Sequence, residues 1–151
     1  MKEFMKLALH EAKKAHEKKE VPIGAVIVKN GQVIARAHNL KETKKDPTAH
    51  AEILVIQEAA RTLETWRLDD CELYVTIEPC PMCAGAMVQS RIKKLIIGAM
   101  EPKFGAAGSI FNIVSHPKLN HKIEVIQGIM EEECSQLMQD FFQRLRQKRK
   151  K

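Results

Sequence analysis

Two short segments, His50-Ala51-Glu52 and Pro79-Cys80-Pro81-Met82-Cys83, constrain the fold of this chain more than any other feature. They offer one imidazole and two thiols, which are preferred ligands of zinc. A structural zinc takes four protein ligands, whereas a catalytic zinc takes three and keeps one position for water. Three are offered at matching spacing: His50, Cys80 and Cys83. The fold must therefore bring the two segments together, and we expect two helix starts that face one another.

Either segment alone has ordinary interpretations. A histidine at a helix start is commonly a cap or a surface residue, and a Cys-x-x-Cys pair can be a redox pair or half of a structural zinc site. A glutamate in the first turn of a helix, such as Glu52, often does no more than complement the helix dipole. The combined pattern H-x-E…P-C-x-x-C is much more specific, because it matches the signature of zinc-dependent nucleobase deaminases.

Glu52 is the candidate for catalysis. It lies two positions after His50, so on a regular helix the two side chains point to different sides. That places the carboxylate beside a metal rather than on it. Two thiolates and one neutral imidazole leave a zinc centre roughly uncharged, so its water is acidified only weakly and a nearby base must help. We predict that Glu52 carries the proton from that water to the ring nitrogen and then to the leaving amine.

The composition indicates one globular domain, which we expect to span residues 1–151. The chain has 44% hydrophobic residues and a net charge of +6. No apolar run approaches the roughly 18 residues of a membrane span, and no secretory signal is visible at the N-terminus. With two of the four cysteines assigned to a metal, no disulfide framework remains, so we expect a reducing cytoplasm. Cys71 and Cys134 are predicted to be buried structural thiols.

The C-terminal end is strongly basic. Six of the last eight residues are Arg144, Arg146, Lys148, Arg149, Lys150 and Lys151. Basic side chains suit the end of a helix, here one predicted from about residue 131, and they equally suit a polyanionic partner. Charge alone does not decide between these interpretations, but a base-modifying site in the same chain favours nucleic acid.

Hydrophobic periodicity predicts alternating helices and strands. Helices are expected over 2–19, 48–63, 81–90 and 131–149, with a short helical piece near 110–115. Strands are expected over 25–29, 32–37, 72–77, 94–99 and 123–127. Asn30-Gly31 predicts a hairpin between the first two strands. The fold class is therefore α/β, a three-layer α/β/α sandwich with a central mixed sheet of about five strands.

The expected helix over 48–63 determines where His50 lies. Asp46 or Thr48 would cap it, with Pro47 suited to its start, and His50 would fall in its first turn. Trp66 would pack after its end. The polar segments 38–48 and 100–109 are expected to be loops.

The residues around the metal motif extend the pattern over almost the whole chain. The shared stretches are Val21-Pro22-Ile23-Gly24-Ala25, Ala37-His38-Asn39, Asp46 to Glu52, Thr76 to Ala86, Gly105-Ala106-Ala107-Gly108-Ser109 and Phe141-Phe142. On these residues the chain resembles the bacterial tRNA-specific adenosine deaminases of the TadA type, within the cytidine deaminase-like superfamily. The glycine loop and the Phe-Phe basic tail are the parts most specific to the tRNA enzymes.

The resemblance implies hydrolytic deamination of adenosine to inosine at the wobble position of a tRNA anticodon, with release of ammonia. It implies one Zn²⁺ per subunit held by His50, Cys80 and Cys83, with Glu52 as the proton carrier. It also implies a homodimer whose partner is the anticodon stem-loop.

The resemblance further implies residues that contact the substrate. Asn39 would contact the target nucleotide, Ile23 would form a wall against its base, and the backbone of Ala51 would help to hold the ring and the water. The RNA-contacting surface would include Lys103, Phe141, Phe142 and Arg144. Each has a structural alternative: Asn39 can be a turn former, Ile23 and the phenylalanines core residues, and Lys103 a solvated side chain.

Two departures from the family pattern lie in the loop that follows the fourth strand. Glu101 stands where the family usually has aspartate, and Phe104 where it has a smaller or polar residue. Two rival functions remain open from the sequence. One is a deaminase of a free base or nucleoside, such as guanine or cytosine, which needs no basic tail. The other is a non-catalytic RNA-binding module with a structural zinc, which needs a fourth ligand.

Overall fold

The computed structural model describes residues 1–149. The sheet has five strands in the order β2-β1-β3-β4-β5. The elements, in chain order, are α1 (Lys2–Glu17), β1 (Gly24–Lys29), β2 (Gln32–His38), α2 (Lys41–Lys44), α3 (Ala51–Leu63), β3 (Cys71–Ile77), α4 (Pro81–Gln89), β4 (Lys94–Ala99), β5 (Glu124–Gln127) and α5 (Glu131–Arg149).

The sheet is mixed, as the sequence predicted. β1 pairs antiparallel with both β2 and β3, whereas β3, β4 and β5 run parallel. The hairpin between β1 and β2 turns at Asn30 and Gly31, whose φ angles are 52° and 76°. Two successive left-handed residues make the tight turn that suits the twist of paired strands, and Asn-Gly adopts it readily. The predicted hairpin is therefore confirmed.

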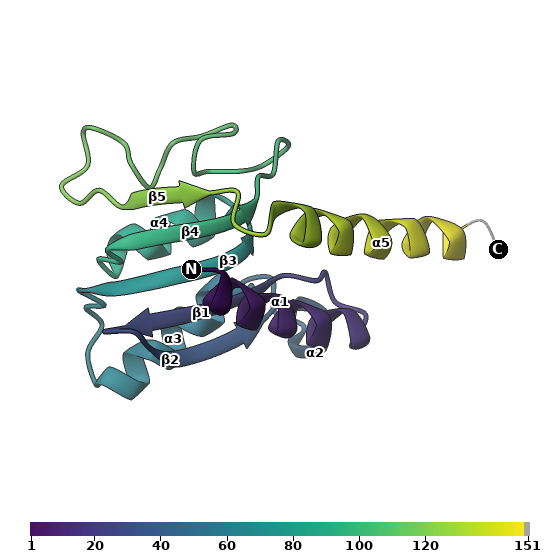
Figure 1. Cartoon of the computed structure of the whole chain (residues 1–151), viewed down its shortest axis with the longest axis horizontal. Helices are drawn as coiled ribbons and strands as arrows, with labels where there is room; N and C mark the ends of the chain where they lie inside the picture. Colours follow the sequence, from purple (N-terminus) through teal and green to yellow (C-terminus); the bar gives the residue numbers. More distant parts are fainter. Residues whose placement is uncertain (150–151) are drawn as a thin grey trace.

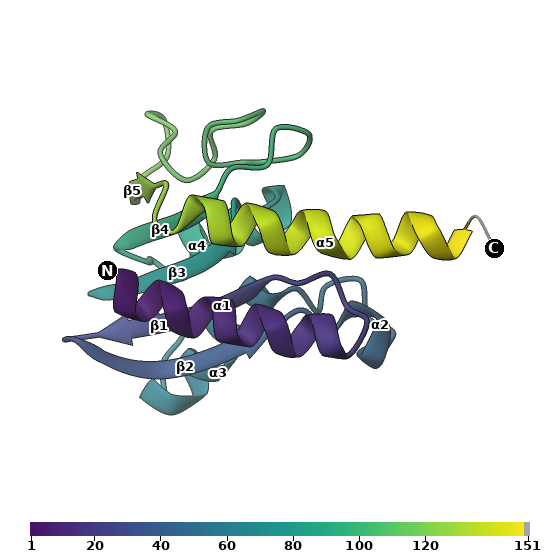
Figure 2. The same ribbon diagram turned by 45° about the vertical axis from the view of Figure 1, so that its right-hand side comes forward.

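Alternation along the strands divides the interior into two cores, one on each face of the sheet. In β3, Leu73 and Val75 join one core and Tyr74 joins the other. The first core is closed by α3 and α4, and the second by α1 and α5. Figures 1 and 2 show this arrangement, with α1 and α5 lying side by side over one face. The three-layer sandwich is therefore confirmed, and α3 and α4 lie together on the face that carries the metal motif.

Three predictions about the segment before His50 are wrong. The polar segment 38–48 contains the short helix α2. α3 begins at Ala51, so His50 is its N-cap and lies before its first turn. Asp46 does not cap α3, because its carboxylate accepts hydrogen bonds from the backbone N–H and hydroxyl of Thr48. The side-chain oxygen of Asp46 therefore closes a local turn that keeps the chain non-helical up to His50.

Two further predictions fail for physical reasons. Residues 110–115 do not form a helix, because Ala107 and Asn112 pair as an antiparallel bridge and the Ile113 N–H donates to the Ala106 carbonyl. Trp66 does not pack into the core but remains 60% exposed, with the Arg67 guanidinium 5.3 Å from its ring centroid. Among residues 1–149, no helix is long and apolar enough to cross a membrane. Cys71 and Cys134 are buried, as predicted.

Candidate metal centre

The two helices that flank the site both begin with a candidate metal ligand. His50 is the N-cap of α3 and Cys80 is the N-cap of α4, and both have extended backbone conformations. Neither side chain caps its own helix, so both are available to a metal. Pro81 occupies the first turn of α4, where its missing N–H costs nothing, and Cys83 follows on the same turn. The local sequence thus aims three donors from two helix starts into one place.

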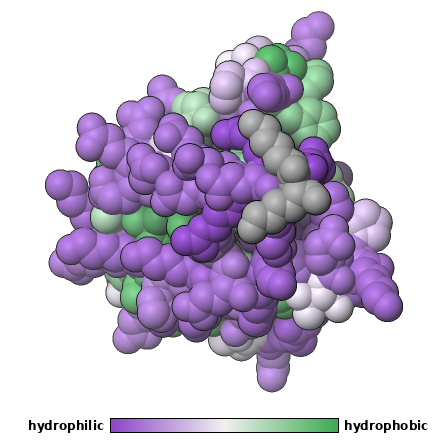
Figure 3. All heavy atoms as spheres, turned by 90° about the vertical axis from the view of Figure 1, so that its right-hand side faces the viewer, coloured by the Kyte–Doolittle hydropathy of each residue, from purple (hydrophilic) through white to green (hydrophobic). Residues whose placement is uncertain are grey.

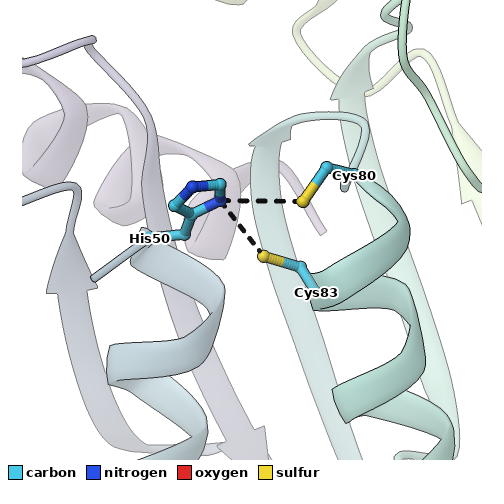
Figure 4. A group of neighbouring side chains, drawn as sticks. All are labelled: His50, Cys80 and Cys83. Atoms are coloured by element: carbon cyan, nitrogen blue, oxygen red, sulfur yellow. Dashed lines mark hydrogen bonds between the residues drawn. The ribbon is translucent and has the colours of Figure 1, made fainter. Parts of the chain in front are cut away.

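The three donor atoms converge, as Figure 4 shows. The Nδ1 atom of His50 lies 3.4 Å from the Cys83 sulfur and 3.7 Å from the Cys80 sulfur. All three atoms lie within 4.8 Å of one another. Since zinc–sulfur and zinc–nitrogen bonds are about 2.3 and 2.0 Å long, one ion placed between the donors can reach all three with small side-chain movements.

Hydrogen bonding within the cluster makes the two cysteines unequal, with Cys80 favoured as thiolate and Cys83 as thiol. Hydrogen bonding from Cys83 lowers the pKa of Cys80 to about 4, although burial opposes the shift and His50 assists it. The same interaction with Cys80, together with burial, raises the pKa of Cys83, so that thiol retains its proton without a metal. Hydrogen bonding to Cys80 also raises the pKa of His50. A metal that binds all three groups must displace protons, as metals generally do at such sites.

Glu52 stands beside the donors and is almost completely enclosed. It is 3% exposed, and its Oε1 atom has no hydrogen-bond partner among the residues that the structure describes. Burial raises the pKa of Glu52 to about 7, with a further contribution from the neighbouring Cys80. An unpartnered buried carboxylate oxygen is costly unless it serves a ligand or a reaction. Its side chain is therefore free to hold or release a proton near neutral pH.

This arrangement fits a catalytic rather than a structural zinc. The donor set is one imidazole and two thiols, and in the described part of the chain no fourth histidine, cysteine or carboxylate joins the group. The carboxylate nearest in sequence, Glu52, leaves an oxygen unsatisfied in a buried position. Three ligands plus a place for water is the composition of catalytic zinc sites.

Of the residues predicted to contact the substrate, Ile23 directly precedes β1, Asn39 directly follows β2, and Ala51 begins α3. Asn39 is buried at the end of β2, where its Oδ1 atom accepts from the Lys41 N–H and its backbone N–H donates to the Ile23 carbonyl. Ile23 is half-buried and packs against both cores. Ala51 is fully buried at the start of α3. The structure therefore links Asn39 to Ile23 directly, and both participate in structural contacts as well.

The four residues predicted to contact RNA divide between two sides of α5. Lys103 and Phe142 line one groove, together with Arg146. Phe141 and Arg144 line a second hollow against α1, where Arg144 donates to Nε2 of His16 at 3.1 Å. Phe141 and Phe142 meet edge to face, with ring centroids 5.3 Å apart. Phe142 is 40% exposed, whereas Phe141 is half-buried, so the two aromatic rings are not equivalent.

Sequence reasoning did not single out Glu78, which directly precedes Pro79-Cys80. Its carboxylate is buried and accepts hydrogen bonds from the loop that follows β4. Its residue type and its position could have indicated this role, because a carboxylate directly after a mostly buried strand must find several hydrogen-bond donors or remain unsatisfied.

Comparison with known proteins identifies the family. The model of the MafB19-like deaminases matches residues 1–146. The chain belongs to this deaminase family. Within it, the chain is 56% identical over 147 residues to the tRNA-specific adenosine deaminase of Bacillus subtilis (strain 168), covering 97% of this chain and 91% of that one. It is 54% identical over 143 residues to the tRNA-specific adenosine deaminase of Aquifex aeolicus (strain VF5), covering 95% and 94%.

Solved structures of deaminases agree with the fold. One from a study of A-to-I editing by tRNA:A34 deaminases at the wobble position superimposes with a TM-score of 0.88 and 47% identity, over 91% of this chain and 99% of that chain. A guanine deaminase from Nitrosomonas europaea gives a TM-score of 0.77 at 24% identity, over 93% and 83%. The second likeness shows the shared fold alone.

Proposed function

We propose that this protein is a tRNA-specific adenosine deaminase, which hydrolyses the wobble adenosine of an anticodon loop to inosine and releases ammonia. The observation that carries the proposal is the identity of 56% over nearly the whole chain with a tRNA-specific adenosine deaminase, combined with a His50, Cys80 and Cys83 cluster beside a buried carboxylate. We further propose that residues 1–151 form one deaminase domain, which the match to residues 1–146 supports.

The metal in this proposal is Zn²⁺, one per subunit, held by His50, Cys80 and Cys83. When bound, zinc would hold and polarise the attacking water, and because the two thiolates offset most of its charge, a nearby base would still be needed to remove the proton. Glu52 then accepts one proton from the attacking water and delivers it to the ring nitrogen. It next takes the remaining proton from the hydroxyl group added to the ring carbon and passes it to the amine, which leaves as ammonia while the carbonyl forms. A carboxyl whose pKa is about 7 suits both the acceptance and the donation of a proton at neutral pH.

The buried site requires that the target base leave its stack. Cys83 and Glu52 are buried, so the exocyclic amine can react only after the nucleotide leaves its stack and reaches these side chains. A single-stranded loop makes that extrusion cheap compared with a duplex. In this proposal Asn39 contacts the nucleotide, Ile23 forms a wall against its base, and the backbone of Ala51 helps to hold the ring and the water.

The RNA backbone is proposed to follow the basic end of α5. Lys103, Phe142 and Arg146 line one groove, and the surface around the end of α5 is mainly hydrophilic (Figure 3). Phe141 and Arg144 would support this surface from the other side of the helix. The last two basic residues, Lys150 and Lys151, lie outside the described residues.

Neutralising two basic side chains on α5 should reduce the salt dependence of RNA binding. The change is Arg146→Gln with Lys148→Gln. We expect affinity to fall and the slope of log K against log salt to become shallower by about 1.4, because each lost phosphate contact removes about 0.7. The measurement is a titration of an anticodon stem-loop by fluorescence anisotropy at several salt concentrations. Lys29→Gln with Lys93→Gln, at the other end of the sheet, is the matched control, and equal slopes in both variants would refute the assignment.

A homodimer is also proposed, with the interface on the outer face of α3 and α4. Trp66 is 60% exposed there and lines a shallow apolar hollow with Ile56, Ala60 and Ala86. A second copy of the chain would cover this apolar surface, and large aromatic residues are enriched in such interfaces. The cytoplasm is the proposed compartment, since the cysteine pair requires reducing conditions to bind a metal.

Trp66→Asp should convert the protein from a dimer to a monomer. An aspartate would place a charge in the centre of an apolar contact, where it would lose its hydration without gaining a partner. Light scattering coupled to size exclusion gives the mass directly. Trp66→Phe serves as the control that keeps the apolar surface. A wild-type protein that already runs as a monomer would contradict the proposed interface.

The proposed substrate class is tested with a panel. The zinc-loaded protein is incubated with an anticodon stem-loop, free adenosine, free cytidine and free guanine, and ammonia release is measured. We expect turnover of the stem-loop only. Turnover of a free base with none on RNA would assign the chain to the small-molecule deaminases. Truncation after Phe142 further distinguishes an RNA deaminase from a small-molecule deaminase, because loss of the basic end should impair only the RNA enzyme.

A further inference from the structure

The carboxylate of Glu78 is the most heavily hydrogen-bonded acidic group beside the metal centre. It is 4% exposed and lies at the end of β3, directly before Pro79-Cys80. One oxygen accepts from the Glu101 N–H at 2.8 Å and from the Ser109 hydroxyl. The other accepts from the N–H groups of Ala107 and Ser109 at 2.9 and 3.0 Å. Four donors from one distant loop therefore end on a single side chain.

These bonds fasten the loop 101–109 at both of its ends. Glu101 begins the loop, while Ala107 and Ser109 close it. The backbone adds a further bond, from the Ala106 N–H to the Pro79 carbonyl at 2.9 Å. Since Pro79 adjoins Cys80, the loop is tied to the turn that carries the metal ligands.

Gly105 lies against the carboxylate, which explains the absence of a side chain there. A Cβ atom at this position would overlap the Glu78 carboxylate. The constraint is one of space, since both groups are buried and the Gly105 N–H already donates to the Glu101 carbonyl. The loop and the carboxylate therefore fit only if residue 105 is glycine.

The same loop forms one wall of the groove beside α5. The groove has a volume of about 640 Å³ and is lined by Met100, Glu101 and Lys103 on the loop side and by Gln139, Phe142 and Arg146 on the helix side. Lys103 on one wall and Arg146 on the other can bind phosphate, and the exposed ring of Phe142 can stack on a base. The position of the loop wall sets the width of this groove.

We infer that Glu78 is a positioning residue for substrate RNA. It holds the loop 101–109 against the turn at Pro79-Cys80 and thereby sets the width of the groove beside α5. This inference rests on the proposed function. Among the described residues, the side-chain hydrogen bonds of Glu78 all go to the loop 101–109. Its role is to place Lys103 and the loop backbone opposite α5.

Glu78→Gln tests the inference, because an amide cannot accept hydrogen bonds at both of its ends. We expect the dissociation constant and KM for the stem-loop to rise about tenfold, since charge-assisted bonds of this kind are each worth that much or more. We expect kcat to change by less than about threefold and the zinc content to remain that of the wild type. Amide exchange, read by mass spectrometry, should accelerate over residues 101–109 and stay unchanged in β1 and β3.

Gly105→Ala provides an independent test, because it leaves the carboxylate intact and displaces the loop from it. It should reproduce the rise in KM and the faster exchange. Glu124→Gln on the exposed edge strand is the matched control and should change neither quantity. A purely structural role would lower kcat with the folded fraction and leave KM and the dissociation constant at wild-type values, which would overturn the inference. If the wild type neither binds nor edits the stem-loop, the proposed function fails, and the exchange measurement still decides whether Glu78 holds the loop.

Discussion

Glu52→Gln should lower the turnover of an anticodon stem-loop by about 10²- to 10⁴-fold, the usual contribution of a positioned general acid–base. The amide has the shape of the carboxylate but can neither accept the proton of the attacking water nor return one to the leaving amine. Glu52 is buried and its Oε1 atom has no hydrogen-bond partner among the described residues, while the amide oxygen of glutamine can still accept the hydrogen bonds that the carboxylate receives from a backbone N–H and from Cys83. We therefore expect the variant to fold and to retain zinc.

The design separates chemistry from binding. Zinc content is measured by atomic emission, stem-loop affinity by anisotropy, and turnover by single-turnover kinetics with saturating protein. Only the last should change. Glu58→Gln, a half-buried carboxylate farther along the same helix α3, is the control and should retain full activity. Surviving activity in Glu52→Gln would exclude the proton-carrier role of Glu52.

Cys83→Ser should remove the metal, and with it the activity. Serine offers a hard, poorly acidic oxygen in place of a thiolate, and Cys83 lies 3.4 Å from Nδ1 of His50 in the centre of the donor set. We expect zinc affinity to fall more than about 100-fold, because the loss of a residue that only supports a metal ligand already costs 10- to 100-fold. Turnover should fall below detection at equal protein concentration.

Chelation and replacement distinguish loss of the metal from loss of the fold. Wild-type protein stripped of zinc should recover activity when zinc is returned, whereas Cys83→Ser should not. Cys134→Ala is the matched control, since this buried cysteine lies on α5 and packs into the other core. It should bind zinc normally and lose only some stability. Full zinc content in Cys83→Ser would show that the three donors do not act as one site.

Most of the fold could be predicted from the sequence because its signals are local. Asn30-Gly31 selects the hairpin turn, and the alternation of Leu73, Tyr74 and Val75 assigns the two faces of β3. The failures occur where a side chain competes with the backbone. Asp46 closes a turn that delays the start of α3, which its sequence pattern does not reveal. The exposure of Trp66 depends on which distant segments pack over it, and the neighbouring sequence does not determine that.

Some residues of the candidate site could be predicted from the sequence pattern itself, and others could not. The ligand set His50, Cys80 and Cys83 follows from residue type and spacing, and the structure brings the three donor atoms together. The residues predicted to bind RNA could be named only through the family, and their division between the two sides of α5 depends on helix rotation. Glu78 was missed because its four donors come from a loop whose path has no sequence periodicity.

The most direct test of the proposed wobble-adenosine deamination varies the position of the adenosine within the anticodon loop. One anticodon stem-loop carries adenosine at the wobble position, and a second carries it one position away in the same loop. After incubation with the zinc-loaded protein, inosine is located by nuclease digestion and mass spectrometry. We expect inosine at the wobble position of the first RNA and none in the second. No inosine in either RNA, alongside deamination of a free base, would contradict it.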